Sequence, residues 1–185
     1  MYSWFLTAIS AVTLVLFPLS ADNHFVNDKS LQDYEQELYH NQEEISCLAV
    51  NIYHEARGES KEGKLAVAFV TLNRVKSDAY PDTVCGVVYQ GKHKPSWRDN
   101  EKLVPIRHRC QFSWYCDGKS DMVQDIDSYE EIFKLSMNVW YGKFEDNTNG
   151  SLFYHADYVN PAWAQHMAMT RRIDNHIFYT IVSSY

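Results

Sequence analysis

The stretch "NIYHEARGESKEGKLAVAFVTLNRV", residues 51–75, contains two helical patterns that meet at a glycine. In the first, over 41–58, apolar residues recur at three- and four-residue spacing, and Gly58 suits the position after a helix end. In the second, over 60–77, the same spacing returns and Ser60 suits an N-cap. The sequence therefore predicts two helices joined by a tight turn.

Glu55 lies in the last turn of the first predicted helix. At about 100° per residue, its side chain projects to the edge of the apolar face. Burial and the partial negative charge at a helix C-terminus both disfavour the ionised form, so we expect a raised pKa. A carboxyl group that stays protonated near neutral pH can act as a general acid. The alternative is a boundary glutamate that pairs with Arg57 or a nearby lysine.

The residues before this region divide into a leader and a linker. Residues 4–19 carry no charge but are short for a membrane span, which needs about 20 residues. We expect 1–21 to be a signal peptide or a signal anchor. In either case the protein is exported to the periplasm or cell wall. If the segment is an anchor, residues 4–19 tether the protein to the inner membrane. Residues 22–42 read as a polar linker or a marginal helix, and Asn41 with Glu44 resembles a capping box at the start of the domain.

Composition and cysteine count narrow the class. The formal net charge of −7 gives no general case for binding nucleic acid, and we expect a monomer. Four cysteines follow the leader, and an even number after an export signal favours disulfides. Three connectivities are open. No CxxC pair is present, which disfavours a zinc knuckle, and no metal or cofactor is expected. The four are Cys47, Cys85, Cys110 and Cys116.

The rest of the chain predicts an α+β domain, with helices early and β segments inserted and late. The expected elements are a short helix after Asp82 as its cap, an irregular basic loop over 91–109, a bent strand or hairpin over 110–118, a helix over 128–142 with Ser128 and Glu131 as capping box, and β-prone runs over 152–159 and 175–182.

Several motifs, in this order, resemble the SleB-like cell-wall hydrolases: "NIYHEARGESKEGKLAVAFVTLNRV", "YPDTVCGVVYQ", "QFSW", "YHADYVNPAW" and "IDNHIFY". The resemblance covers residues 43–181, and we take 43–185 as the catalytic domain. It implies a lysozyme-like, mainly helical α+β fold related to lytic transglycosylases and resuscitation-promoting factors, with peptidoglycan glycan strands as substrate. The family's essential glutamate falls on Glu55.

Further site residues are expected around Glu55. The resemblance implies groove roles for Gln111, Phe112, Ser113, Tyr154 and His155. Trp114, Tyr115, Tyr158 and Trp163 are aromatic residues outside the helical stripes, where rings can stack on sugar faces. Core packing is the competing explanation for each of them.

Two reaction outcomes are open for cleavage between N-acetylmuramic acid (MurNAc) and N-acetylglucosamine (GlcNAc). With one carboxylate the product is a 1,6-anhydro sugar, which defines a lytic transglycosylase, and we favour this outcome. With a second carboxylate, water attacks and the enzyme is a muramidase. Candidates for the second acid are Glu59, Asp117 and Asp157.

Two further alternatives differ in class from a glycan-cleaving enzyme. One is a zinc amidase that uses His54, His155 and His176. The other is a peptidoglycan-binding module without activity. A compact exported wall hydrolase, either a phage endolysin or a bacterium's own enzyme, fits the sequence better than a role in spore germination.

Overall fold

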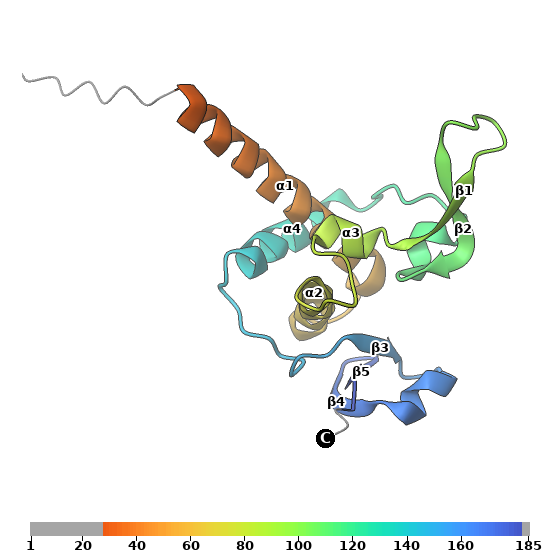
Figure 1. Ribbon diagram of the computed structural model, residues 1–185. Helices are drawn as coiled ribbons and strands as arrows, with labels where there is room; N and C mark the ends of the chain where they lie inside the picture. The colour runs from red at the N-terminus through yellow and green to blue at the C-terminus, as the bar shows by residue number, and fades with distance from the viewer. Residues whose placement is uncertain (1–27, 183–185) are drawn as a thin grey trace, which may run out of the picture.

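The computed structural model describes residues 28–182 (Figure 1), so the predicted leader over 1–21 and the first residues of the predicted linker lie outside the described part. Four α-helices, two 3-10 helices and five strands make up this part of the chain. In chain order they are α1 (Asp28–Ala56), α2 (Lys61–Val75), α3 (Val84–Val88), β1 (Gly91–Pro95), β2 (Leu103–Cys110), η1 (Ser113–Cys116), α4 (Ile126–Trp140), β3 (Phe153–Ala156), η2 (Ala162–His166), β4 (Ala168–Ile173) and β5 (His176–Thr180).

Helix α1 is longer than predicted. It runs through Asn41 without interruption, so Asn41 is an interior residue and the expected capping box at the domain start is wrong. No glycine or proline occurs between Asp28 and Ala56, and nothing in the local sequence therefore stops the helix. Its first half, residues 29–40, is exposed and projects from the rest of the molecule (Figure 1).

Glu44 caps a different helix. Its side chain is 4% exposed, and Oε2 accepts a hydrogen bond from the backbone N–H of Val84 at the start of α3. Thr83 is the N-cap of α3, and its hydroxyl accepts from Gly86, so the expected cap at Asp82 is also wrong. A disulfide from Cys47 to Cys85 joins the same two helices.

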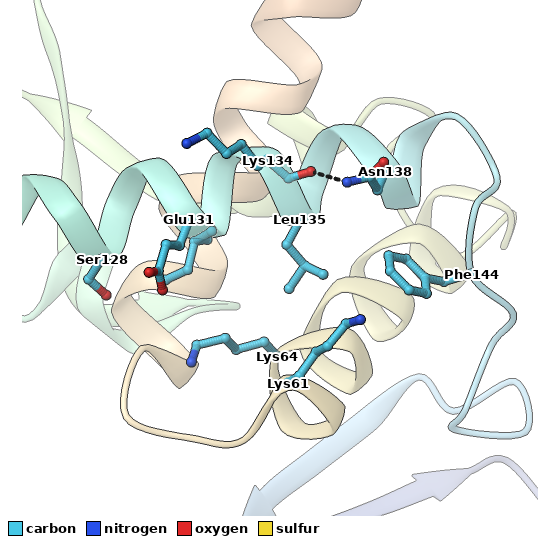
Figure 2. Close-up of a pocket in the computed structure, with 9 residues that line it drawn as sticks. Lys61, Lys64, Ser128, Glu131, Lys134, Leu135, Asn138 and Phe144 are labelled. Atoms are coloured by element: carbon cyan, nitrogen blue, oxygen red, sulfur yellow. Dashed lines mark hydrogen bonds between the residues drawn. The ribbon is translucent and has the colours of Figure 1, made fainter.

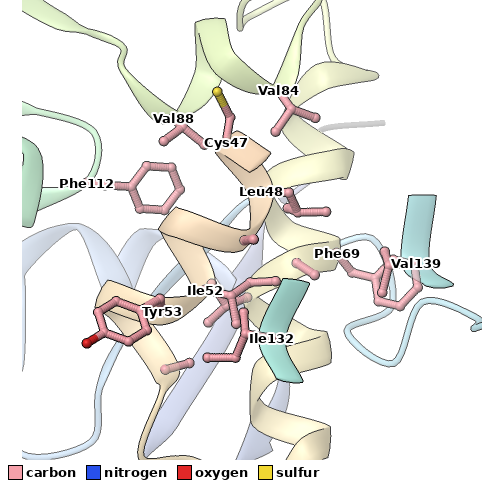
Figure 3. Close-up of a cluster of buried hydrophobic side chains, with 14 of the residues drawn as sticks. Cys47, Leu48, Ile52, Tyr53, Phe69, Val84, Val88, Phe112, Ile132 and Val139 are labelled. Atoms are coloured by element: carbon pink, nitrogen blue, oxygen red, sulfur yellow. The ribbon is translucent and has the colours of Figure 1, made fainter. Parts of the chain in front are cut away.

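The main core lies where α1, α2, α3 and α4 pack together (Figure 3). Leu48 and Ile52 from α1 are fully buried against Val67 of α2, Val84 of α3 and Ile132 of α4. This confirms the apolar faces predicted for the first two helices. The N-cap of α2 is Ser60, as predicted, whereas α4 is capped by Asp125, whose Oδ1 accepts from the N–H of Ser128. The predicted box of Ser128 and Glu131 therefore does not form the cap.

The basic segment predicted as an irregular loop is an antiparallel hairpin of β1 and β2. Pro95 and Pro105 lie within its strands and a bulge shifts the register after Gly91, which breaks the alternation that would have indicated strands. The next segment, predicted as a bent strand or hairpin, is instead the 3-10 helix η1. A disulfide between Cys110 and Cys116 closes this turn.

A three-stranded antiparallel sheet in the order β3-β5-β4 completes the fold. The two predicted β runs form β3 and β5, with Tyr154 opposite Phe178, and β4 was missed in the connection between them. Phe178 is fully buried against Ala66 and Val70, which joins this sheet to α2. The α+β class is confirmed. Among the described residues, no helix combines the length and apolar character needed to cross a bilayer.

Candidate active site

A cavity of about 540 Å³ opens between the end of α1, the segment 111–117 and strand β3. The predicted catalytic and groove residues line it: Glu55, Gln111, Phe112, Ser113, Trp114, Tyr154 and His155. Tyr115 and Trp163, which the sequence analysis also offered as rings that could stack on sugars, do not line it. The other lining residues are His54, Arg74, Asp117, Ala156, Tyr158, Val159 and His176. Segments from opposite ends of the described domain, His54 on α1 and His176 on β5, thus meet at one site.

Glu55 is positioned by the last turn of α1 and by strand β3. Its Oε2 accepts a hydrogen bond of 2.9 Å from the Tyr154 hydroxyl. Burial raises the pKa of Glu55 above its usual value, while the Tyr154 hydrogen bond and the charge of Arg74 work in the opposite direction. The expected direction of the pKa shift is therefore confirmed, with desolvation as the main cause.

Arg57 does not fold back onto Glu55. Its Nη1 donates to the backbone carbonyl of Tyr53, and its guanidinium lies 5.1 Å from the centroid of the Tyr53 ring. The simple explanation of Glu55 as the partner of Arg57 is therefore wrong. The cation that acts on Glu55 is Arg74, which comes from the neighbouring helix.

Arg74 is a site residue that the sequence analysis missed. Its side chain is 5% exposed, Nε donates to the backbone carbonyl of Leu152, and the guanidinium lies 5.0 Å from the Phe112 ring centroid. Its Nη1 has no hydrogen-bond partner among the described residues. The sequence did contain a signal for a buried Arg74. Residues 65–70 of α2 are apolar on every face, which predicts a helix buried all round, and Arg74 lies in the last turn of that helix.

One wall of the cavity is made by β3 and its neighbours. Tyr154 packs edge-on against His176, and His155 uses both ring nitrogens in hydrogen bonds, to the Ala156 carbonyl and to the Tyr179 hydroxyl, each 2.9 Å. His176 is buried, which lowers its pKa. These contacts fix the rings and leave Tyr158, which is 84% exposed, as the free aromatic surface at the cavity mouth.

The opposite wall is made by η1 and the residues before it. Trp114 stacks on His54 with 4.4 Å between ring centroids, and its indole Nε1–H donates to the side-chain oxygen of Asn51. Trp114 is 8% exposed and Phe112 is 2% exposed. Both residues line the cavity yet are almost fully buried, so most of the surface of each ring serves packing. Gln111 and Ser113 are exposed polar residues on the same wall.

The three candidates for a second carboxylate lie in different places. Glu59 accepts hydrogen bonds from the backbone and side chain of Asn175, and Asp157 pairs with Arg172 at 2.6 Å; neither lines the cavity. Asp117 does line it, next to Lys119 at 3.7 Å. Of these three acids, Asp117 alone faces the same space as Glu55.

The histidines of the zinc alternative, His54, His155 and His176, all line the cavity. Across residues 28–182, however, no three His, Cys, Asp or Glu side chains converge on a point where they would hold a metal ion. His54 Nε2 is hydrogen-bonded to the Asp121 carbonyl.

A separate cavity of about 370 Å³ lies between α2 and α4 (Figure 2). Lys61, Lys64, Glu131, Leu135 and Phe144 are among the residues that line it, and the Lys61 ammonium lies 4.6 Å from the Phe144 ring centroid. None of the predicted site residues contributes to it.

A carboxyl group with a raised pKa at a helix end, facing an open cavity with polar and aromatic walls, is the kind of site with which enzymes cleave glycosidic bonds by acid catalysis. Comparison with known protein families then identifies the family of this chain. The model of the cell wall hydrolase family matches residues 58–179, and the chain belongs to this family. Glu55 lies three residues before the matched span.

Relatives and solved structures agree with this family. The chain is 30% identical over 136 residues to a spore cortex-lytic enzyme of Bacillus subtilis and 28% identical over 139 residues to one of Oceanobacillus iheyensis, covering 73% and 75% of this chain. It spans 37% and 42% of the length of those two relatives.

Two solved structures share the fold. The catalytic domain of the Bacillus cereus SleB protein has a TM-score of 0.56 at 28% identity, and covers 75% of this chain and 91% of its own. The catalytic domain of the germination-specific lytic transglycosylase SleB from Bacillus anthracis has a TM-score of 0.53 at 27% identity, with coverage of 74% and 93%. The predicted resemblance and fold class are confirmed.

Proposed function

We infer that this protein cleaves the MurNAc–GlcNAc bond of peptidoglycan as a lytic transglycosylase. The observation that carries this function is Glu55, a carboxyl group whose pKa is raised by burial and whose Oε2 is held by Tyr154 at the wall of an open cavity. Membership of the cell wall hydrolase family supports peptidoglycan as the substrate.

In the reaction, Glu55 donates its proton to the glycosidic oxygen while the bond from the anomeric carbon to that oxygen breaks, and the electron pair leaves with the oxygen. The Glu55 carboxylate then removes the proton from the muramyl 6-hydroxyl, whose oxygen attacks the anomeric carbon and closes the 1,6-anhydro ring. Glu55 ends protonated, ready for another cycle. The Tyr154 hydroxyl and the Arg74 charge stabilise the carboxylate between the two steps.

A muramidase is the second candidate, and Asp117 is the observation that favours it. Asp117 lines the same cavity and has the chemistry to activate a water molecule. The products separate the two reactions, because hydrolysis leaves reducing-end muramic acid and transglycosylation leaves the anhydro form.

We propose that the protein acts outside the cytoplasm, in the periplasm or at the cell wall, where its substrate lies. The two disulfides, Cys47–Cys85 and Cys110–Cys116, support an oxidising compartment. Tethering through residues 4–19, which lie outside the described residues, and a monomeric state are parts of the same proposal.

The decisive experiment digests purified sacculi with the wild type and with Glu55→Gln, followed by mass spectrometry of the released fragments. Loss of a general acid is expected to slow release by about 10²–10⁴-fold. Glu59→Gln is the matched control and keeps its activity, because Glu59 contacts Asn175 outside the cavity. Undiminished release by Glu55→Gln would remove the proposed mechanism, and absence of any released fragment with the wild type would favour a binding module.

A further inference from the structure

The β1–β2 hairpin has a charge opposite to that of the rest of the molecule. Residues 91–110 contain six Lys and Arg and two acids, a net charge of +4, whereas the rest of the chain contains 11 Lys and Arg and 22 acids, a net charge of −11. When positive and negative charges are separated in this way, a polyanion is attracted to the positive part of the protein and repelled by the rest. The hairpin also projects from the domain (Figure 1).

The cations of the hairpin are available for a partner. All six are exposed: Lys92, Lys94, Arg98, Lys102, Arg107 and Arg109. Within the described part of the chain, Lys102 has an ion pair, with Asp99 at 3.4 Å, and the other five have none. Their charges are therefore not neutralised inside the protein.

The base of the hairpin is fixed to the wall of the active-site cavity. Strand β2 ends at Cys110, which is bonded to Cys116, and the chain passes directly into Gln111. His93 on β1 is hydrogen-bonded to the Tyr115 hydroxyl at 3.2 Å. The Arg107 guanidinium lies against Gly118, next to Asp117 of the cavity lining. A polymer that leaves the cavity on this side meets the hairpin.

The tip of the hairpin offers an aromatic face. Trp97 is 84% exposed, and the Arg98 guanidinium lies 4.7 Å from the centroid of its ring. Indole faces stack on sugar rings, and a neighbouring cation can pair with a carboxylate on the same polymer.

We propose, building on the proposed function, that the β1–β2 hairpin is a docking arm that holds peptidoglycan alongside the cavity through the carboxylates of its stem peptides. Peptidoglycan has both features that the hairpin recognises, sugar faces and repeated carboxylates. The cations extend along both strands down to the cavity wall, which suits an extended polymer lying beside the arm. An anionic membrane touched by the tip would leave Lys92 and Arg109, at the base, without a role.

The test measures binding to purified sacculi in the Glu55→Gln background, so that little substrate is consumed during the measurement. The triple variant Lys92→Gln/Lys94→Gln/Arg109→Gln is compared with Lys76→Gln/Lys134→Gln/Lys143→Gln, which removes the same charge from exposed lysines outside the hairpin. The hairpin variant is expected to bind on the order of tenfold more weakly, given the energies of exposed ion pairs, and added salt is expected to reduce this difference. Trp97→Ala provides a second, uncharged change.

With Glu55 intact, the hairpin variant is expected to cleave soluble glycan strands whose lactyl and stem-peptide carboxyl groups have been converted to amides as fast as the wild type. Equal binding of both triple variants to sacculi overturns the docking arm. Binding of the hairpin variant is also measured on vesicles of anionic phospholipid, and a loss of binding seen with these vesicles but not with sacculi overturns it as well. Failure of the proposed function is read separately, as absence of cleavage by the wild type on either substrate. Unchanged thermal midpoints show that the variants remain folded.

Discussion

At the scale of single residues, the protonation of Glu55 is set by opposing contacts. Burial favours the neutral acid, whereas the Tyr154 hydroxyl and the Arg74 charge favour the carboxylate. A residue that must first donate a proton and then accept one needs both influences, because either one alone would block half of the cycle.

Tyr154→Phe is expected to extend activity to higher pH. The substitution removes a hydrogen bond that lowers the pKa of Glu55, so that pKa rises further and the active acid persists at higher pH. The alkaline limb of the profile of kcat/KM against pH should therefore move up, while the rate at the optimum falls. Tyr158→Phe is the control, since Tyr158 lines the cavity without touching Glu55. An alkaline limb that stays in place would contradict the role assigned to Tyr154.

Glu55→Gln is expected to be more stable than the wild type at pH 8. The pKa of Glu55 in the folded protein is raised above 4.5, so the folded state holds the proton more tightly than the unfolded state. Ionisation above that value therefore costs folding free energy, which a neutral glutamine avoids. Below about pH 4 the glutamate is neutral in both states, and the difference should vanish. Thermal midpoints at the two pH values check this, and a constant difference would be inconsistent with it.

At the scale of elements, helix α1 organises the domain through contacts made at successive positions along the helix. Glu44 caps α3, Cys47 is bonded to Cys85, Leu48 and Ile52 fill the core, and Glu55 reaches the cavity. One rigid helix therefore sets the position of the catalytic carboxyl relative to α3 and the core.

Removing the two disulfides is expected to have unequal effects. Cys47–Cys85 closes 38 residues and Cys110–Cys116 closes six, so the chain-entropy model gives stabilisation of about 4 and about 2 kcal/mol. Cys47→Ser/Cys85→Ser should therefore lower the free energy of unfolding more than Cys110→Ser/Cys116→Ser, as measured with denaturant. The second pair closes the turn that forms the cavity wall, so its loss should reduce activity more than its effect on stability indicates.

At the scale of the whole molecule, the exposed half of α1 is separate from the packed domain. Residues 29–40 are exposed throughout, including Leu31, Tyr34 and Leu38, whereas burial begins at Glu44 and Ile45. The predicted domain start at residue 43 lies close to this change in burial.

The free energy of unfolding of a chain that starts at residue 41 is therefore expected to lie within about 0.5 kcal/mol of that of a chain that starts at residue 28, because the removed segment buries little surface. A chain that starts at residue 46 should be clearly less stable, since it lacks the cap of α3 and a core side chain. Denaturant unfolding of the three chains checks this. A large loss already at residue 41 would show that the projecting segment supports the fold.

The sequence alone determined the helices of the core, the β runs of β3 and β5, and the placement of Glu55 at a helix end. These follow from local periodicity and from the glycine and serine between α1 and α2, which act through neighbouring residues. The β1–β2 hairpin was not predicted because its prolines and its bulge break the alternation of apolar and polar residues that indicates strands. Strand β4 was not predicted because the segment between β3 and β5 shows no clear alternation.

Only the tertiary structure decided which side chains meet Glu55. Tyr154 comes from a strand 99 residues away, and Arg74 reaches the same cavity from α2 with its Nε on Leu152. The tertiary structure also decided which of the three possible disulfide connectivities forms. Among the candidate second acids, it placed Asp117 at the cavity and Glu59 and Asp157 outside it. Contacts between distant segments depend on how the elements pack, and the spacing of residues along one element carries no information about them.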